Sequence, residues 1–304
     1  MATNIRQVEP SSPVPKRKPK TSGAILALPA ALWLGIFFIL PLFFVGLISF
    51  MSRGRAGVQY TFPLTLDNYA LVFGDVYFPI FTRSLTIALV TTIICLIIGY
   101  PLAFFISTRK SRIMQSLSLF LVILPFWTNF LVRTYAIKVL LGSDGPLNGL
   151  LLSLGLISEP LTIINTPEAV YLGLVYSFLP FMVLPIYASV ERFDFRLVEA
   201  AHDLGANDLR AFLRVVLPLT LPGVLAGSVL VFIPVVGAFI TPDLLGGTSG
   251  LMIGNLISDW FGGTGVWPRG AAMSMLMIGL VMLALVGYAV ASARGAQLNR
   301  KSAE

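Results

Sequence analysis

Residues 84–108 read SLTIALVTTIICLIIGYPLAFFIST, a run of 25 residues without a single Asp, Glu, Lys or Arg. About 20 apolar residues are enough for a helix to cross the hydrocarbon core of a bilayer. The run is apolar on every side and does not alternate between polar and apolar residues. It therefore predicts a membrane-spanning helix and not a strand of a β-barrel.

Five more charge-free stretches occur along the 304-residue chain, at 21–52, 113–132, 169–190, 215–242 and 270–293. We therefore expect an all-α integral membrane protein with six transmembrane helices. The expected helices cover 23–51, 83–108, 113–138, 168–190, 216–242 and 270–293, and the last five form a core over 80–292. Residues 145–158 are uncharged too, but they are too short to span and predict a short helix at the membrane interface.

Composition supports the membrane assignment, because 56% of the residues are hydrophobic and only 12% are charged. A soluble domain has about 25% charged residues. One cysteine, Cys95, excludes an internal disulfide, and one histidine, His202, argues against a His-built metal site or a Ser-His-Asp triad. We expect no metal and no bound cofactor. In a membrane protein, the net charge of +7 indicates basic cytoplasmic loops rather than a nucleic-acid partner.

Lys and Arg residues are distributed unevenly between the two sides. The tail 1–22, the connections after the second and fourth spans and the tail 294–304 hold fifteen of them, whereas the other three connections hold four. Cytoplasmic loops carry the excess of positive charge, so both termini are expected in the cytoplasm. The polar, proline-rich tail 1–22 is expected to be disordered and to lie near anionic lipid.

The largest cytoplasmic connection, 191–218, reads ERFDFRLVEAAHDLGANDLRAFLRVVLP. Apolar residues recur at helical spacing up to Leu204, and Gly205 is expected to end that helix or bend it sharply. Asn207 is placed to cap a second short helix, and Pro218 begins the return to the membrane. On physical grounds alone, this segment is either an ordinary helical loop or a surface that another protein can approach closely through its small residues.

One spacing in this segment resembles a known motif. The spacing consists of Glu199-Ala200-Ala201, three residues, Gly205, nine residues, Val215, one residue and then Leu217-Pro218. It is similar to the spacing of the EAA loop of ABC importer permeases. Val215 stands where that family usually has Ile. The resemblance implies a coupling helix that docks on a separate ATPase subunit, with Glu199, Ala200, Ala201, Asp203, Gly205, Leu217 and Pro218 as the coupling residues. The chain has no G-x-x-x-x-G-K-[ST] phosphate loop, so it is not expected to be that ATPase.

The similarity extends over about 66–290 and is closest to the spermidine/putrescine-type subfamily, in particular to its first permease subunit. It is carried by Gly99-Tyr100-Pro101-Leu102-Ala103, Leu124-Pro125-Phe126-Trp127, Leu131-Val132-Arg133-Thr134-Tyr135-Ala136 and Thr241-Pro242-Asp243-Leu244-Leu245-Gly246-Gly247, among other segments. The resemblance implies a second permease subunit, two ATPase subunits that use ATP, a soluble solute-binding protein and a bacterial inner membrane. Sister systems for opines, amino-acid derivatives or ferric ion share much of this pattern.

Several residues are candidates for the solute path, each with a structural alternative. Arg133 carries a charge at membrane depth, which either has a function in transport or extends to the membrane interface. For Lys138, extension to the interface is the favoured interpretation. Asp243 either attracts a cation at the outer mouth of the path or caps the following segment. Asp259 either attracts a cation on the outer side as well or anchors its connection at the membrane interface. Trp127, Tyr135 and Tyr176 either hold an ammonium group or belong to packing and interfacial belts.

The leading hypothesis is thus a transport subunit without enzymatic activity, importing polyamines or a related small solute. A stand-alone secondary transporter is the second class, but such proteins usually place several acids inside their spans. A membrane enzyme has little support, because no pair of acids converges within the expected helices.

Overall fold

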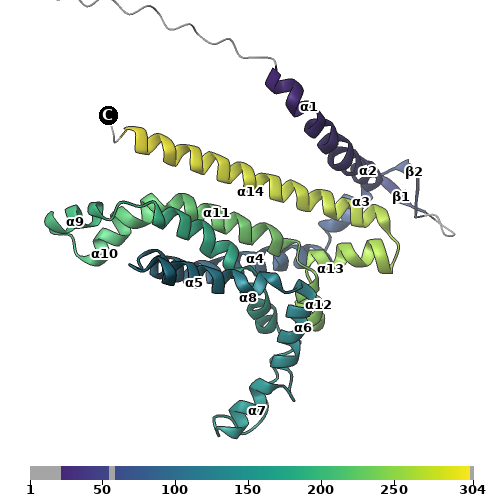
Figure 1. The fold of residues 1–304 in the computed structure, drawn as a ribbon. Coiled ribbons are helices and arrows are strands. Elements are labelled where there is room, and N and C mark those ends of the chain that lie inside the picture. Colours follow the sequence, from purple (N-terminus) through teal and green to yellow (C-terminus); the bar gives the residue numbers. More distant parts are fainter. Residues whose placement is uncertain (1–21, 55–58, 302–304) are drawn as a thin grey trace, which may run out of the picture. The chain divides into compact units, whose positions relative to one another are not determined.

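The computed structural model describes residues 22–54 and 59–301, almost all of them helical (Figure 1). The chain divides into two compact units at Val45 and Gly46. The first unit contains α1 (Ser22–Leu34), a π-helical turn (Gly35–Ile39) and the beginning of α2 (Leu40–Ser49). Its helix is apolar on all sides and none of its span is buried within the chain, as is typical of a helix whose surroundings are lipid or another subunit.

The second unit begins with the end of α2, which is followed by a short antiparallel pair of strands, β1 (Met51–Arg53) and β2 (Tyr60–Leu64), in which Met51 pairs with Leu64. Its longer helices are α4 (Phe78–Ser107), α5 (Arg112–Ile123), α6 (Phe130–Leu141), α8 (Pro167–Glu191), α11 (Leu217–Val236) and α14 (Trp267–Lys301). Its shorter helices are α3 (Asp67–Val72), α7 (Pro146–Ser153), α9 (Arg196–Asp203), α10 (Asp208–Ala211), α12 (Ile240–Leu245) and α13 (Ile253–Ser258). The sequence did not predict this pair of strands.

Five of the helical stretches in the described part of the chain are long and apolar enough to cross a membrane: 27–49, 78–107, 167–191, 208–236 and 267–290. A sixth span arises if the bent pair 112–127 and 130–153 is counted as one. The fold class expected from the sequence, an all-helical membrane protein with six spans, agrees with this arrangement. The short helix expected within 145–158 is α7.

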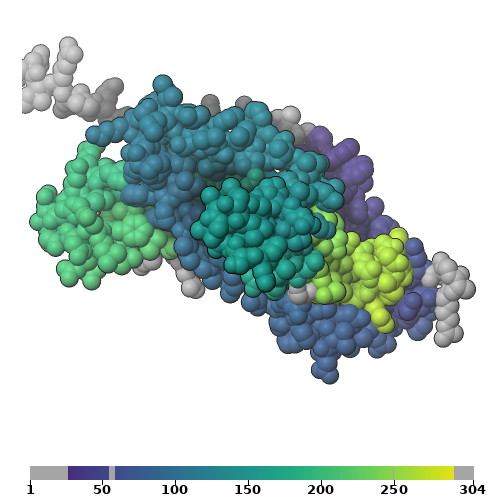
Figure 2. Space-filling view, turned by 90° about the horizontal axis from the view of Figure 1, so that it is seen from below, coloured from purple at the N-terminus to yellow at the C-terminus, as the bar shows by residue number. Residues whose placement is uncertain are grey.

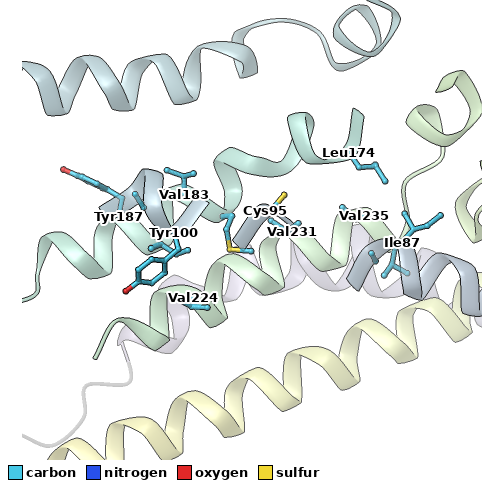
Figure 3. Packing of buried hydrophobic residues seen from close by; sticks show 14 of the residues in the cluster. Ile87, Cys95, Tyr100, Leu174, Val183, Tyr187, Val224, Val231 and Val235 are labelled. Atoms are coloured by element: carbon cyan, nitrogen blue, oxygen red, sulfur yellow. The ribbon is translucent and has the colours of Figure 1, made fainter. Parts of the chain in front are cut away.

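The core of the second unit is formed where α4, α8 and α11 pack together (Figure 3). Apolar side chains from the three helices interlock there, among them Cys95, Val183 and Val231. One polar contact lies among them, between the hydroxyl groups of Tyr100 and Thr220 at 2.8 Å. Buried hydroxyls need a partner because water is excluded, and this pair satisfies both groups.

Small residues, Gly223 and Gly227 on α11, let these helices approach closely. A Cβ atom on Gly227 would lie 3.0 Å from the carbonyl oxygen of Met182, and one on Gly223 would lie 2.6 Å from that of Pro185. The two glycines are four residues apart and therefore share one face of α11. This spacing of small residues brings the backbones of α11 and α8 together, a common packing mode in membranes.

The third expected span, 113–138, is not one continuous helix. Helix α5 ends in a 3₁₀ turn (Leu124–Trp127), and α6 starts at Phe130 after a bend of 94°. Pro125 removes a backbone donor, and the side chain of Asn129 accepts a hydrogen bond from the Leu131 amide at 2.8 Å as the N-cap of α6. Absence of charge identified the stretch as apolar but gave no information on this backbone break.

Several connections of the second unit gather at two opposite ends, whereas α6 and α7 project to one side (Figure 1). The end of α4, the end of α8 and the beginning of α11 lie together with α9 and α10, whereas α12 and α13 lie at the other end (Figures 1 and 2). At that other end the amide of Ile253 donates to the hydroxyl of Ser84 at 2.8 Å, which ties α13 to the beginning of α4. The two ends can therefore be compared as opposite faces of a membrane protein.

Candidate coupling segment and solute path

The segment between α8 and α11 begins with α9, whose end is set by Gly205. The amide of Gly205 donates to the His202 carbonyl at 2.8 Å, and that of Ala206 donates to the Ala201 carbonyl at 3.0 Å. Gly205 has a φ of +83°, in the left-handed region that favours glycine. These are the bonds of a Schellman motif, so the prediction that Gly205 ends the helix is confirmed.

The predicted cap at Asn207 is confirmed, but the second helix is not separate. The Asn207 side chain accepts a hydrogen bond from the Arg210 amide at 3.0 Å, and α10 begins at Asp208. Helix α10 then continues through a π-helical turn (Phe212–Val216) directly into α11. Pro218 follows the π-helical turn inside this continuous helix, where it removes one backbone donor without ending the helix.

Aromatic rings attach this segment to the ends of the core helices. The ring of Phe195 lies 6.2 Å from that of Phe104 on α4, and the ring of Phe212 lies 5.5 Å from that of Tyr100. Since Tyr100 also bonds Thr220 of α11, the segment is held at both of its ends. The segment thus contacts α4 near its beginning and both α4 and α11 near its end.

The outer surface of the segment is open to a partner. Glu199, Ala200, Asp203 and Gly205 are exposed, and Leu204 is 89% exposed although it is apolar. Of the other candidate coupling residues, Ala201 and Leu217 are half-buried and Pro218 is exposed. His202 and Asp208 lie 3.2 Å apart across the Gly205 turn and form an ion pair when the imidazole is protonated. A cavity of about 430 Å³ adjoins the segment, lined by Ser189, Arg192, Phe193, Asp194 and Leu197 among others.

Arg133 lies inside the chain and not on its surface. Its side chain is buried, with 8% of the residue exposed, and Nη1 donates to the Pro125 carbonyl at 2.8 Å. The guanidinium carbon lies 5.4 Å from the ring centres of Phe126 and Phe130 and 6.0 Å from that of Tyr176. The rings and the carbonyl hold the charge inside the protein.

The other candidate path residues do not converge in this chain. Trp127 is 76% exposed and its ring contacts Phe120, while Tyr135 is exposed on α6. Asp243 is exposed within the first turn of α12, whose N-cap position is occupied by Phe239. Asp259 is exposed at the end of α13. Lys138 is half-buried beside a cavity of about 320 Å³ that Ser143 and Thr162 also line.

Two features of the site were missed by the sequence analysis. The ring contacts that attach α9 to α4 join residues far apart in sequence, so no local pattern could reveal them. The aromatic surroundings of Arg133 had a weak local signal, since Phe126 and Phe130 flank the Pro125–Asn129 break. Within the residues that the structure describes, no three His, Cys, Asp or Glu side chains come together as a metal site would require.

Comparison with known proteins identifies relatives over most of the chain. Residues 95–296 match the family model "Binding-protein-dependent transport system inner membrane component". The chain is 46% identical over 269 residues to the spermidine/putrescine transport system permease protein PotB of Haemophilus influenzae, covering 88% of this chain and 92% of that protein. It is 45% identical over 255 residues to PotB of Escherichia coli K12, covering 83% and 92%.

Solved structures share the fold at low sequence identity. A bacterial ABC transporter that imports the acidic polysaccharide alginate has a chain with a TM-score of 0.69 and 17% identity, covering 91% of this chain and 95% of that one. The alginate transporter in complex with its pentasaccharide-bound periplasmic protein gives a TM-score of 0.73 at 16% identity, with coverages of 90% and 94%. At such identities the likeness concerns the fold alone.

Proposed function

Since the chain belongs to the family of binding-protein-dependent transport system inner membrane components, we propose that the importer it serves takes up a small polyamine such as spermidine or putrescine. The chain is the permease of an ABC importer and is not itself catalytic. The observation that carries the choice of solute is the 46% identity to a spermidine/putrescine permease, which extends over nearly the whole of both proteins. Opines, amino-acid derivatives and ferric ion remain the alternatives within the same class of importer.

The distribution of charge supports a cationic solute. Asp75, Asp243 and Asp259 are exposed at the end of the second unit that holds α12 and α13. Exposed carboxylates at an entrance raise the local concentration of a di- or tri-cation. Arg133 and Arg269 would oppose such a solute; the charge of Arg133 is enclosed by rings rather than displayed at this surface, and Arg269 is half-buried at the beginning of α14.

We also propose that α9 and the Gly205 turn form the coupling helix. In this proposal the chain works with a second permease subunit, two ATPase subunits that bind and hydrolyse ATP, and a soluble solute-binding protein. Closure of the ATPase pair moves α9, and the rings of Phe195 and Phe212 carry that movement to α4 and α11. The spans then open toward the binding protein, and the chain itself catalyses no covalent step.

The solute proposal is tested by uptake of labelled spermidine and putrescine into vesicles that contain the assembled importer. We expect Asp243→Asn to lower uptake by about two- to five-fold at unchanged expression, since an exposed charge interaction contributes about 0.5–1 kcal/mol. Glu159→Gln, in the exposed connection between α7 and α8, serves as the control for a general loss of negative charge. Absence of uptake by the wild type rejects a polyamine, and equal uptake by wild type and Asp243→Asn rejects a role for that charge.

A further inference from the structure

The bend in the third span is built around one carbonyl group. Pro125 ends the helical hydrogen-bond pattern of α5, and its carbonyl oxygen accepts from the Thr128 hydroxyl at 2.7 Å and from the Thr128 amide at 3.3 Å. The Arg133 guanidinium donates to the same oxygen at 2.8 Å from the far side of the bend. Arg133 thus joins the two halves of the broken span, since Pro125 lies before the bend and Arg133 lies on α6 after it.

The rings around Arg133 connect the bend to α8. The ring of Phe126 lies 4.9 Å from that of Phe181, and the ring of Phe130 lies 6.4 Å from that of Phe178. Tyr176, the third ring near the guanidinium, is also on α8. Both sides of the bend therefore contact the same face of α8, and Arg133 lies among the contacts.

A charge in this place needs a reason, because burying a guanidinium is costly and an apolar side chain of similar size could fill the space. Its Nε atom is buried and has no hydrogen-bond partner among the described residues, so not every donor is satisfied. An apolar side chain could not form a directional hydrogen bond to the Pro125 carbonyl. A planar donor held between ring faces and one carbonyl fixes the angle between the two half-helices, whereas apolar packing alone permits several angles.

Helix α8 leads from this cluster directly to the coupling segment. It runs without interruption from Pro167 to Glu191, and α9 begins five residues later at Arg196. On the other side of the bend, α6 leads to α7 and the connection that returns to α8. Helices α6 and α7 form an arm that contacts α8 through Arg133 and the rings around it. A movement of α8 that starts at α9 would therefore act on this arm through those contacts.

We propose that Arg133 is a positioning residue of the transport cycle, which fixes α6 to α8 so that the arm α6–α7 moves together with α8. The guanidinium acts through Pro125 and the rings and touches no solute. The inference rests on membership in the importer family and does not depend on which solute is carried.

The direct test measures the position of the arm in the assembled importer, with Cys95 replaced by Ala. Spin labels at Ser153, at the end of α7, and at Arg192, at the end of α8, report one distance distribution. We expect a narrow distribution in the wild type, both without nucleotide and with ATP bound to a hydrolysis-deficient ATPase subunit. In Arg133→Met we expect a broad distribution that differs between the two states. A distribution in Arg133→Met as narrow as that of the wild type overturns the proposal.

Two further variants separate positioning from folding. Lys138→Met removes a positive charge from the same helix at a half-buried site that makes no hydrogen bond or ion pair among the described residues, and it should keep the wild-type distribution. Arg133→Lys keeps the charge but loses the planar donor, and it should broaden the distribution less than Met does. A broad distance distribution in Lys138→Met counts against a specific role of the guanidinium. Distributions that match the wild type in both Arg133→Lys and Arg133→Met also count against it.

A functional readout follows from the same idea. Stimulation of ATP hydrolysis by the solute-loaded binding protein should fall about ten-fold in Arg133→Met, as expected for loss of a charged hydrogen bond, while the KM for ATP stays unchanged. A variant that was only unstable would lower the amount of assembled complex and leave the stimulation of each assembled complex intact. Normal stimulation per complex in Arg133→Met would therefore contradict the proposal even if the yield were low.

Discussion

At the scale of the residue, Gly205 shows how a backbone conformation can be required without any crowding. Its φ of +83° is unfavourable for other L-residues by about 1–2 kcal/mol, yet a Cβ atom there would have no atom within 4 Å. The open space lies on the exposed surface between α9 and α10. The glycine is therefore suited both to the turn and to the close approach of another protein.

We expect Gly205→Leu to reduce co-purification of the ATPase subunit about ten-fold, because strain in the turn and a protruding side chain both act at the docking surface. Gly155→Leu is the matched control, since Gly155 has a φ of +66° and equally open space but follows α7. The measurement is the ratio of ATPase subunit to permease after affinity purification from membranes. Equal ratios in the two variants would show that strain alone is responsible and that Gly205 has no role in docking.

At the scale of the element, composition predicted where helices are but not where they break. Residues 84–108 and 169–190 were recognised because an uninterrupted apolar run leaves a spanning helix as the only way to satisfy its backbone. Charge counting did not locate the break near Pro125, because the break depends on the amide hydrogen that Pro125 lacks and on its carbonyl, to which Thr128 and Arg133 both donate. Helix α10 was expected to stand alone because Pro218 was read as a boundary, whereas the helix continues through the π-helical turn and past Pro218.

The candidate site shows the same division. The Gly205 turn and the Asn207 cap were predictable, because each is a local bond with its own residue preference. The contacts of Phe195 with Phe104 and of Arg133 with Tyr176 were not predictable, since they depend on how distant helices pack. The local motif was therefore enough to predict the function of the chain, whereas the contacts between distant helices could be found only in the structure.

The packing of α11 on α8 gives a prediction for a helix pair. Gly223→Ala places a Cβ atom 2.6 Å from the Pro185 carbonyl oxygen, so the two backbones must separate. Overpacking of this kind costs about 1–3 kcal/mol, which corresponds to a fall of about 2–10 °C in the thermal unfolding midpoint of the purified permease. Gly279→Ala is the control, because Gly279 also lies in a membrane helix and has no atom within 4 Å of an added Cβ. Identical midpoints for both variants would exclude close backbone packing at Gly223.

At the scale of the whole molecule, charge distinguishes the two ends of the second unit. Arg109, Lys110 and Arg192 lie in the connections after α4 and α8, at the end that holds α9, whereas Asp75, Asp243 and Asp259 are exposed at the other end. Positive charge marks the cytoplasmic side of a membrane protein, and an ATPase that uses cellular ATP must bind on that side. The basic end and the proposed coupling helix therefore coincide, as a working importer requires.

This coincidence predicts the orientation of the entire chain. In a Cys95→Ala background, single cysteines at Lys20, Lys110, Gly205 and Leu298 should react only with a membrane-permeable reagent in intact cells, because all four positions are expected in the cytoplasm. A cysteine at Thr264, exposed between α13 and α14, should react with an impermeable reagent. Labelling of Thr264 shows that the reagent reaches the outer surface, so protection of the other four positions is then meaningful. If Lys110 or Gly205 were labelled from outside, the proposed coupling helix would lie on the wrong side of the membrane and could not contact an ATPase.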